Sequence, residues 1–462
     1  MMQKLERGIH LLTDYSGTGQ PEAVLHRARS LAEGFGVAVK LDCARASDVA
    51  AHCREVLLAY DSPRMCVLGD LVARQSARFR KRLAAITIAT RCKLREATTQ
   101  CSNPDKRCTL AERARFIWLH KVRALIVNSP CSTEQKAYCY RHQTECPAVP
   151  SPSALPDGKA PLRLCVAGIS CLDWSSRGSR KKTLGKGSAA WASFLKEIYD
   201  SEPDTVVLEC TRAYRHEDLE FVLGSKYTLS WLVFSPTQVG IPSERFRKYM
   251  IMMKNGGMLK WKPGAEISEA NFLKTFGRRL VVSGHVYMHS TPDGLIQSEL
   301  DRCASRRHLP SRDADGKTFS FRSLLTPKRS AILAEWEEHA NARGHGPHDE
   351  VMYDIAHHPR FGNLTAAAPA ITTKNMPWSR QLSRPMLVEE KLEAQGFPVV
   401  HPEATLGLEC PWGSALKNMS PSKLSSLAGN AMHFAAIGLV MAYVWAYTDM
   451  NSTNTSSSSD CD

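Results

Sequence analysis

Residues 9–22, IHLLTDYSGTGQPE, give the first indication of the fold. A short apolar run leads into a loop that contains Gly17 and Gly19. Pro21 follows, which is typical of the first turn of a helix, and apolar side chains then recur at helical spacing. The stretch therefore predicts a strand, a glycine loop and a helix.

Two further apolar runs extend this pattern. Residues 37–41 end at Asp42, and residues 65–68 end at Gly69 and Asp70, with Ser47 expected to cap the helix between them. This β-α-β-α-β order predicts an α/β, Rossmann-like fold with a mostly parallel sheet. A carboxylate at the end of the second strand can bind ribose hydroxyls, so Asp42 and Asp70 indicate an adenosine-containing cofactor. Alternatively, the glycines make a turn and the aspartates cap helices.

Composition limits the class of protein. The chain has 462 residues, enough for two or three domains, and a net charge of +14, which favours a polyanionic partner. Its 15 cysteines are an odd number without a secretory signal, which favours reduced thiols. Residues 431–447 are apolar but short for a membrane span of about 20 residues, so we expect a core helix and no membrane.

A basic segment interrupts the α/β pattern. Residues 71–95 contain no acidic side chain, and six cysteines follow between Cys92 and Cys146, together with His120 and His142. A zinc site is one reading, but there is no C-x-x-C pair and the spacings are loose. The sequence favours a basic helical insertion, for which we predict no metal, and a proline-rich linker over residues 147–161.

The pattern then resumes and places reactive side chains at predicted strand ends. Cys171 ends the run 162–169, and Glu209 ends the run 205–208. Residues 231–234 form another run, and Arg245 and Arg247 precede the next, 249–253. Being two apart, both arginines are expected on one side of a strand. A thiolate beside positive charge is a good nucleophile, although a buried structural cysteine is the common alternative.

The order of these motifs resembles the cytosine-5 DNA methyltransferase family. DYSGTG is similar to the glycine loop for S-adenosylmethionine, and ISCLDWSSRG to the motif with the nucleophile. The resemblance further includes Asp42, Gly69-Asp70-Leu71, LECT, GIPSERFRKYMIM, LVEEKLEAQGFP and LAGNAMHF, in the family's order. It implies a Rossmann-like methyltransferase fold. The cofactor would be bound by Tyr15, Gly17, Gly19, Asp42, Asp70, Leu71 and Asn430.

The resemblance also implies a mechanism and a partner. Cys171 would add to C6 of a flipped cytosine, Glu209 would hydrogen-bond N3, Arg247 would hold O2, and Arg245 completes the catalytic set. Double-stranded DNA would be the partner, bound by a monomer in the nucleus. The loop after Cys171 is expected to bind phosphates through Arg177, Arg180, Lys181, Lys182 and Lys186.

Several supporting residues depart from the family's pattern. Ser170 and Leu172 flank the cysteine in place of proline and glutamine, Cys210 replaces an asparagine, and Ser243 and Ala431 replace glutamine and serine. Three alternatives therefore stay open: an RNA cytosine-5 methyltransferase, a catalytically inactive nucleic-acid-binding relative, and a nicotinamide-dependent oxidoreductase.

The expected organisation has six parts. These are a cofactor-binding part (1–71), the basic cysteine-containing insertion and linker (72–161), a catalytic part (162–254), a target-recognition domain (255–380), C-terminal motifs that return to the catalytic domain (381–450), and a disordered tail (451–462).

Overall fold

The computed structural model describes residues 4, 6–152, 159–169, 173–174, 182–265, 267–310, 319–400 and 412–451. The chain divides into two compact units. Unit 1 comprises Met1–Val233, Arg247–Phe272 and Ile437–Asp462, and unit 2 comprises Phe234–Phe246 and Leu273–Ala436. These units do not coincide with the predicted parts, because most of the C-terminal motifs, 381–436, group with unit 2.

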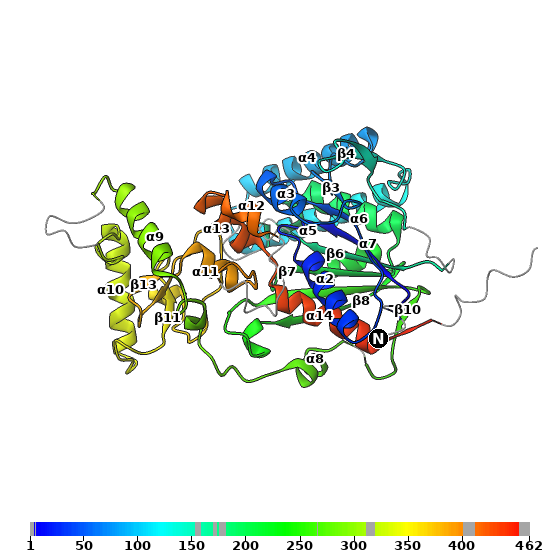
Figure 1. Ribbon diagram of the computed structural model, residues 1–462. Helices are drawn as coiled ribbons and strands as arrows, with labels where there is room; N and C mark the ends of the chain where they lie inside the picture. Colours follow the sequence, from blue (N-terminus) through cyan, green and yellow to red (C-terminus); the bar gives the residue numbers. More distant parts are fainter. Residues whose placement is uncertain are drawn as a thin grey trace, which may run out of the picture. The chain divides into compact units, whose positions relative to one another are not determined.

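Unit 1 is built on a nine-stranded sheet in the order β5-β4-β3-β2-β1-β6-β7-β9-β8 (Figure 1). The central strands β3, β2, β1, β6 and β7 are parallel, and β9 is antiparallel to β7. This is the Rossmann-like arrangement that the sequence predicts. The strands are β1 (Ile9–Asp14), β2 (Leu41–Ser47), β3 (Cys66–Leu68), β4 (Lys136–Cys139), β5 (Thr144–Pro147), β6 (Leu162–Gly168), β7 (Thr205–Thr211), β8 (Tyr227–Phe234) and β9 (Arg247–Lys254).

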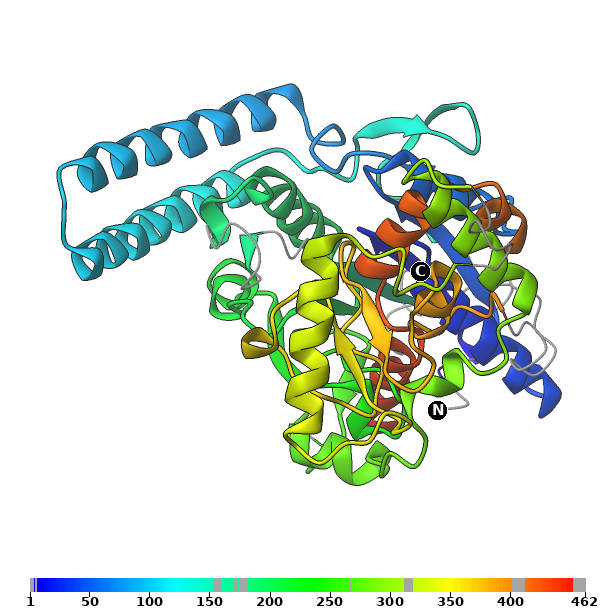
Figure 2. The same cartoon turned by 90° about the vertical axis from the view of Figure 1, so that its left-hand side faces the viewer.

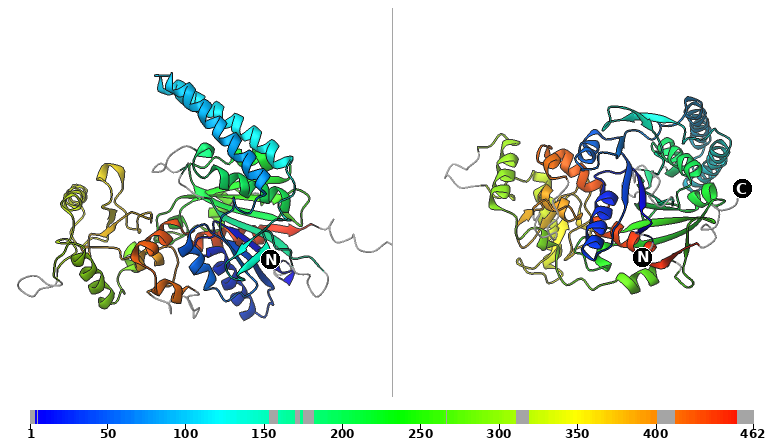
Figure 3. Two further views of the ribbon diagram at one scale, coloured as in Figure 1. Left: turned by 90° about the horizontal axis from the view of Figure 1, so that it is seen from above. Right: turned by 45° about the vertical axis from the view of Figure 1, so that its right-hand side comes forward.

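Helices cover both faces of this sheet (Figure 3). One face carries a large apolar core, to which α4–α7 contribute. On the other face α14 lies close to α2, because a Cβ at Gly438 of α14 would lie 3.5 Å from the side chain of Val24 of α2. The helices of unit 1 are α2 (Gln20–Gly34), α3 (Ala51–Leu58), α4 (Ala77–Thr99), α5 (Pro104–Val127), α6 (Ser188–Ser201) and α7 (Glu217–Leu223), with most of α14 (Phe434–Tyr447).

The basic insertion is only partly helical. Its α4 and α5 form a long antiparallel pair that extends from the sheet (Figure 2). The chain then returns as a hairpin, β4 and β5, which joins the sheet beside β3. Arg74, in the basic segment 71–95, is 1% exposed. Its Nη2 lies 2.6 Å from Oδ1 of the buried Asp14.

The predicted second strand is wrong. β2 is Leu41–Ser47, so Asp42 is its second residue, and Ser47 is its last residue instead of a helix cap. Arg45 in the middle of β2 is completely buried and ion-paired with Asp14 and Glu197. The charge of Arg45 makes β2 look polar in the sequence, because the residues that compensate this charge come from other elements. The apolar pattern therefore does not locate β2.

Unit 2 contains a three-stranded antiparallel sheet and a small aromatic core. Trp336 stacks on Tyr353 with a centroid distance of 5.2 Å, and Trp378 is also buried. Its elements are α9 (Asp293–Ser305), α10 (Pro327–Asn341), β11 (Met352–Asp354), β12 (Pro377–Ser379), β13 (Arg384–Pro385), α11 (Val388–Glu393), α12 (Gly413–Lys417) and α13 (Pro421–Asn430). The recognition domain predicted for 255–380 lies largely in this unit.

The apolar C-terminal segment packs in unit 1. Within the described chain, Pro421–Tyr447 is the one stretch long and apolar enough to cross a membrane by length and composition. This stretch is interrupted between the helices α13 and α14. Of its most apolar 18 consecutive residues, 61% are buried. Tyr443 of α14 contacts Phe272 of α8 (Glu269–Phe276), as expected of a core helix. After α14, β14 (Thr448–Met450) pairs with β10 (Leu259–Trp261).

Candidate cofactor and catalytic site

The topology of the sheet defines where a ligand would bind. The strand order reverses between β1 and β6, since β2 and β3 follow on one side and β7 on the other. In open α/β sheets, ligands bind outside the carboxyl ends of the strands at this switch point. Asp14 at the end of β1 is paired with Ala167 of β6. The glycine loop and the segment that leads to Cys171 therefore leave the sheet side by side.

The glycine loop has the backbone that the sequence predicts. Gly17 and Gly19 have φ values of 57° and 75°, in the left-handed region. A Cβ at Gly19 would lie 2.9 Å from the ring of Tyr60, whereas a Cβ at Gly17 would meet no described atom within 4 Å. No side chain caps the N-terminus of α2, which begins immediately after Gly19. The loop thus offers open space beside backbone N–H groups.

The carboxylate beside this loop is Asp48, not Asp42. Asp48 follows the carboxyl end of β2, and its Oδ2 accepts a hydrogen bond of 3.0 Å from the backbone N–H of Gly17. Its Oδ1 accepts another of 2.8 Å from Ala50, and burial raises its pKa. Asp42 is ion-paired with the buried His10, 2.7 Å between Oδ2 and Nδ1, at the amino end of β2. There it lines a separate pocket of about 350 Å³.

The other predicted cofactor residues have different surroundings. Asp70 is exposed just after β3, as predicted, while Leu71 is 5% exposed and packs into the core. Tyr15 is half-buried against Phe194, and burial raises its pKa. Only the backbone of Leu71 is therefore available to a ligand.

Asn430 lies in unit 2, at the last position of α13, and is exposed. The residue before it, Gly429, is a glycine for a specific structural reason. A Cβ at this position would lie 2.2 Å from the backbone nitrogen of Thr373, so no larger side chain fits without movement of the backbone.

The predicted catalytic residues Glu209 and Arg247 form an ion pair. Arg247 Nε lies 2.7 Å from Glu209 Oε1, and Glu209 is 6% exposed. They come from the neighbouring strands β7 and β9, in which Thr211 is paired with Arg247. Glu209 is also paired with Gly168, and its carbonyl accepts a hydrogen bond of 3.0 Å from the N–H of Ile169. Cys171 lies outside the described residues, but the chain leaves β6 beside Glu209.

Arg245 does not share a strand with Arg247, because β9 begins at Arg247. It belongs to unit 2, where it is 3% exposed. Its guanidinium donates to the carbonyls of Ile371, at 3.0 Å, and Ala431, at 2.6 Å. These contacts hold backbone segments of unit 2 together, so the expectation of two neighbouring arginines on one strand face is wrong.

Part of the predicted phosphate-binding loop is described. Arg177, Arg180 and Lys181 lie outside the described residues, whereas Lys186 is exposed and Lys182 is ion-paired with Glu112 of α5. Partial burial raises the pKa of Glu112, but hydrogen bonds from Lys182 and Arg115 lower it to about 2. A pocket of about 670 Å³ lies between this segment, α4 and α5, with a basic lining of Arg91, Arg95, Arg115, Lys182 and Lys186.

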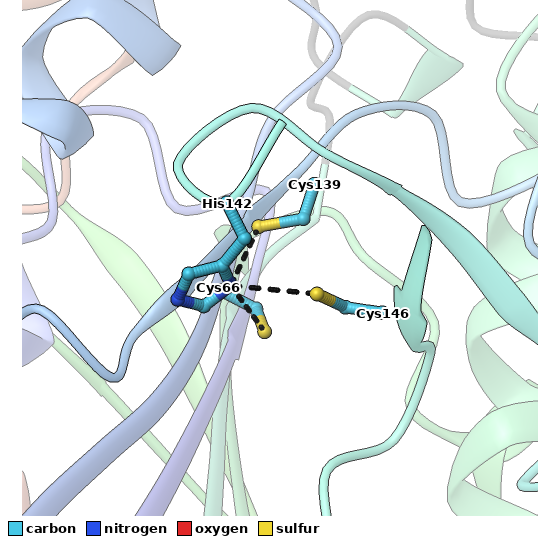
Figure 4. Close-up of side chains that lie close together, drawn as sticks. All are labelled: Cys66, Cys139, His142 and Cys146. Carbon is cyan, nitrogen blue, oxygen red and sulfur yellow. Dashed lines mark hydrogen bonds between the residues drawn. The ribbon is translucent and has the colours of Figure 1, made fainter. Parts of the chain in front are cut away.

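The structure also assembles a cluster that the sequence did not predict. Cys66, Cys139, His142 and Cys146 meet where the β4–β5 hairpin joins β3 (Figure 4). The local pattern C-x-x-H-x-x-x-C over residues 139–146 is the signal that could have found three of them. Cys66 lies far earlier in the chain, and only the pairing of strands brings it to the others.

Comparisons with known proteins gave structural similarity only. No protein-family model matches the sequence, and no curated protein is significantly similar to it. The S. pombe Dnmt2 methyltransferase is 13% identical, with a TM-score of 0.42 over 95% of this chain and 98% of that chain. The Entamoeba histolytica methyltransferase EhMeth is 9% identical, with a TM-score of 0.44 over 95% and 98%.

A Spodoptera frugiperda DNMT2 mutant is 12% identical, with a TM-score of 0.41 over 95% of this chain and 99% of that chain. Similarities at this level carry no conclusion about what this chain binds or modifies. The proposal for its function therefore depends on its own residues.

Proposed function

We propose that the chain transfers a methyl group from S-adenosylmethionine to C5 of cytosine in DNA. The observation that supports this most is the Glu209–Arg247 ion pair of 2.7 Å. It lies beside the end of β6, from which the chain continues to Cys171, and the glycine loop leaves the adjacent strand β1. A carboxyl, a guanidinium and a glycine loop thus converge on the edge of the sheet from which the chain continues to Cys171.

The residues at this edge fit the cofactor. The open space at Gly17 and the uncapped N-terminus of α2 suit its carboxylate, and Asp48 suits the ribose hydroxyls. Asp70 at the next strand end suits the adenine amino group. When bound, the cofactor supplies an activated methyl group. Asp48 takes the role that the sequence assigned to Asp42.

The chain's own groups would activate the base. The Cys171 thiolate would add to C6 of a flipped cytosine, while the Glu209 carboxyl, in its protonated form, would donate a hydrogen bond to N3 and stabilise the charge that the addition places on the ring. Arg247 would orient the Glu209 carboxyl and contact O2. Once C5 has taken the methyl group, with the demethylated cofactor as the leaving group, the C5 proton would pass to water and the C6–sulfur bond would break, which restores the aromatic ring and the Cys171 thiolate.

One residue near this site that departs from the family's pattern has a structural explanation. Cys210 stands where the family has asparagine, and it is buried. Its thiol donates a hydrogen bond to the carbonyl of Ile169, 3.6 Å from the sulfur. Cys210 therefore supports the backbone that leads to Cys171, which is a role an asparagine side chain could also fill. This supports an active enzyme over an inactive relative.

The helix pair α4–α5 supports a nucleic-acid partner. It carries 13 lysine and arginine residues against three acidic ones. Such a concentration of positive charge favours contact with phosphates. A nicotinamide-dependent oxidoreductase is less well supported, because β9 is antiparallel, whereas the dinucleotide fold continues with parallel strands.

The test is transfer of labelled methyl groups from S-adenosylmethionine to unmodified duplex DNA, with structured RNA in a parallel reaction. We expect the label in DNA, recovered as 5-methylcytosine. Labelling of RNA alone would identify the RNA branch of the family. No labelling of either substrate, despite measured binding of cofactor and nucleic acid, would contradict an active enzyme.

A further inference from the structure

Four potential metal ligands meet at the edge of the sheet in unit 1. Cys66 is on β3, Cys139 ends β4, His142 lies in the hairpin turn, and Cys146 is on β5. Their ligand atoms all lie within 4.8 Å of one another, and the two cysteines nearest the sheet's interior, Cys66 and Cys139, are buried (Figure 4). The three sulfurs surround a single ring nitrogen, His142 Nδ1.

The distances fit a tetrahedral ion. The sulfurs of Cys139 and Cys146 each lie 3.4 Å from His142 Nδ1, and that of Cys66 lies 3.7 Å from it. Zinc–sulfur bonds of about 2.3 Å and a zinc–nitrogen bond of about 2.0 Å, at tetrahedral angles, place sulfur and nitrogen roughly 3.5 Å apart. Hydrogen bonding alone does not explain the arrangement, because one nitrogen lone pair can accept from only one thiol at a time.

The surroundings also prepare the ligands. His142 Nε2 lies 3.0 Å from the carbonyl oxygen of Pro63. Donation by Nε2–H to this carbonyl leaves the lone pair on Nδ1, facing the sulfurs, as zinc-bound histidines require.

We propose that Cys66, Cys139, His142 and Cys146 bind one zinc ion in a closed structural site. Three thiolates and one imidazole form a soft ligand set that suits zinc. With four protein ligands no position remains for water, so the ion is not catalytic. The sequence predicted no metal in this region because the insertion has no C-x-x-C pair and its cysteines are loosely spaced; the fourth ligand, Cys66, precedes the insertion.

The site would hold a hairpin whose strands are short and pair little with the rest of the sheet. β4 and β5 have four residues each, β4 is paired with β3 through Cys139 and Leu68, and Tyr140 donates a backbone hydrogen bond of 2.8 Å to Val67. An isolated hairpin of this length is at best marginally stable in water. A metal that joins Cys66 to both strands of the hairpin would fix it to the sheet.

The turn of the β4–β5 hairpin also supports the edge of unit 1 at which we propose that the cofactor binds. Arg141 donates to the carbonyls of Leu57, at 3.0 Å, and Tyr60, at 3.1 Å, at the C-terminal end of α3. The guanidinium of Arg54 on α3 lies 4.2 Å above the ring of Tyr140 and donates to the Asp48 carbonyl. Loss of the ion would thus loosen α3 as well as the hairpin.

The experiment uses the full chain, purified without chelators and, in parallel, refolded anaerobically with zinc or cobalt. Elemental analysis should find about one zinc per chain. Cobalt should give the intense visible absorption of a tetrahedral ion, with a thiolate-to-metal charge-transfer band. Cys146→Ser, at the half-buried ligand, should lose the zinc and lower the thermal midpoint, and Cys146→His should restore part of both.

Cys108→Ser is the matched control, because Cys108 is an exposed cysteine on α5 outside the cluster, and it should retain the zinc. Equal zinc content in Cys146→Ser and Cys108→Ser would overturn the proposal. So would a folded, fully reduced protein that takes up neither zinc nor cobalt, or a disulfide within the cluster in freshly purified, metal-free protein. None of these measurements depends on methyl transfer, so they test the metal site separately from the proposed function.

Discussion

The Asp48 carboxylate accepts a hydrogen bond of 3.0 Å from the backbone N–H of Gly17. This contact joins the end of β2 to the glycine loop that follows β1. It places a carboxylate beside the glycine loop and gives the chain a candidate cofactor residue that differs from the one its sequence suggested. Asp42 is ion-paired with His10 at the other end of the same strand.

We predict that Asp48→Asn weakens binding of S-adenosylmethionine more than tenfold. The amide keeps an acceptor for Gly17 but loses the charge, and hydrogen bonds to charged groups contribute about 1.5 to 3 kcal/mol. Calorimetric titration measures the change. Asp42→Asn is the matched control and should bind normally; a larger loss in that variant would return the role to Asp42.

We predict that Cys171 is the covalent nucleophile. DNA containing 5-fluorocytosine should form a stable complex with the protein when S-adenosylmethionine is present, because fluorine cannot leave C5 as a proton does. Cys171→Ala should lose trapping and turnover but still bind both ligands.

Cys165→Ala and Cys210→Ala are the controls for trapping. Both cysteines are buried, and burial raises the pKa of Cys165 well above its ordinary value. These variants should still be trapped. A complex that forms in Cys171→Ala, or that maps to Cys210 in the unmodified protein, would show that another thiol reacts.

We expect Glu209→Gln to lower kcat by about 100-fold or more, since acid–base groups typically contribute 10²–10⁴-fold. Binding of the cofactor should not change, because Glu209 contacts Arg247 and not the glycine loop. Steady-state kinetics and calorimetry separate the two effects. Glu220→Gln, an exposed residue of α7, should leave kcat unaltered. A Glu209→Gln variant with normal kcat would remove the ion pair from the mechanism.

The basic pocket beside α4 and α5 should bind phosphates. We predict that Arg95→Gln combined with Lys186→Gln weakens DNA binding and flattens its salt dependence. The log–log slope should fall by roughly 0.9 for each phosphate that the protein no longer neutralises. Lys40→Gln tests a similarly exposed lysine at the amino end of the sheet and should not alter the slope. Equal slopes for all three proteins would place the DNA elsewhere.

Arg74 should be important for stability, because it is buried and ion-paired with Asp14. Arg74→Met leaves the buried carboxylates Asp14 and Glu197 short of one compensating charge. We expect a loss of about 3 to 5 kcal/mol in the free energy of unfolding. Arg78→Met, at an exposed position on α4, should change it by less than about 0.5 kcal/mol. Denaturant titration compares the two, and equal stabilities would contradict a structural role for Arg74.

Local patterns in the sequence determined much of the fold. Apolar runs located β1, β3, β6, β7 and β9 to within a few residues, because each is a continuous buried strand. The glycines of the first loop and the position of Asp70 followed from the same reasoning, whereas Glu209, expected at a strand end, lies within β7, which continues to Thr211. An apolar run therefore locates the buried body of a strand, and the strand can continue past the first polar residue.

Only the tertiary structure decided the features that depend on distant partners. The apolar pattern does not locate β2, because this strand contains the buried Arg45. Asp14 and Glu197, which compensate the charge of Arg45, lie on other elements. Arg245 and Arg247 fall into two units because β9, which belongs to unit 1, begins at Arg247. The Cys66, Cys139, His142 and Cys146 cluster exists because β4 pairs with β3. Burial of charge and assembly of ligands are set by contacts between segments far apart in the chain, which local periodicity does not encode.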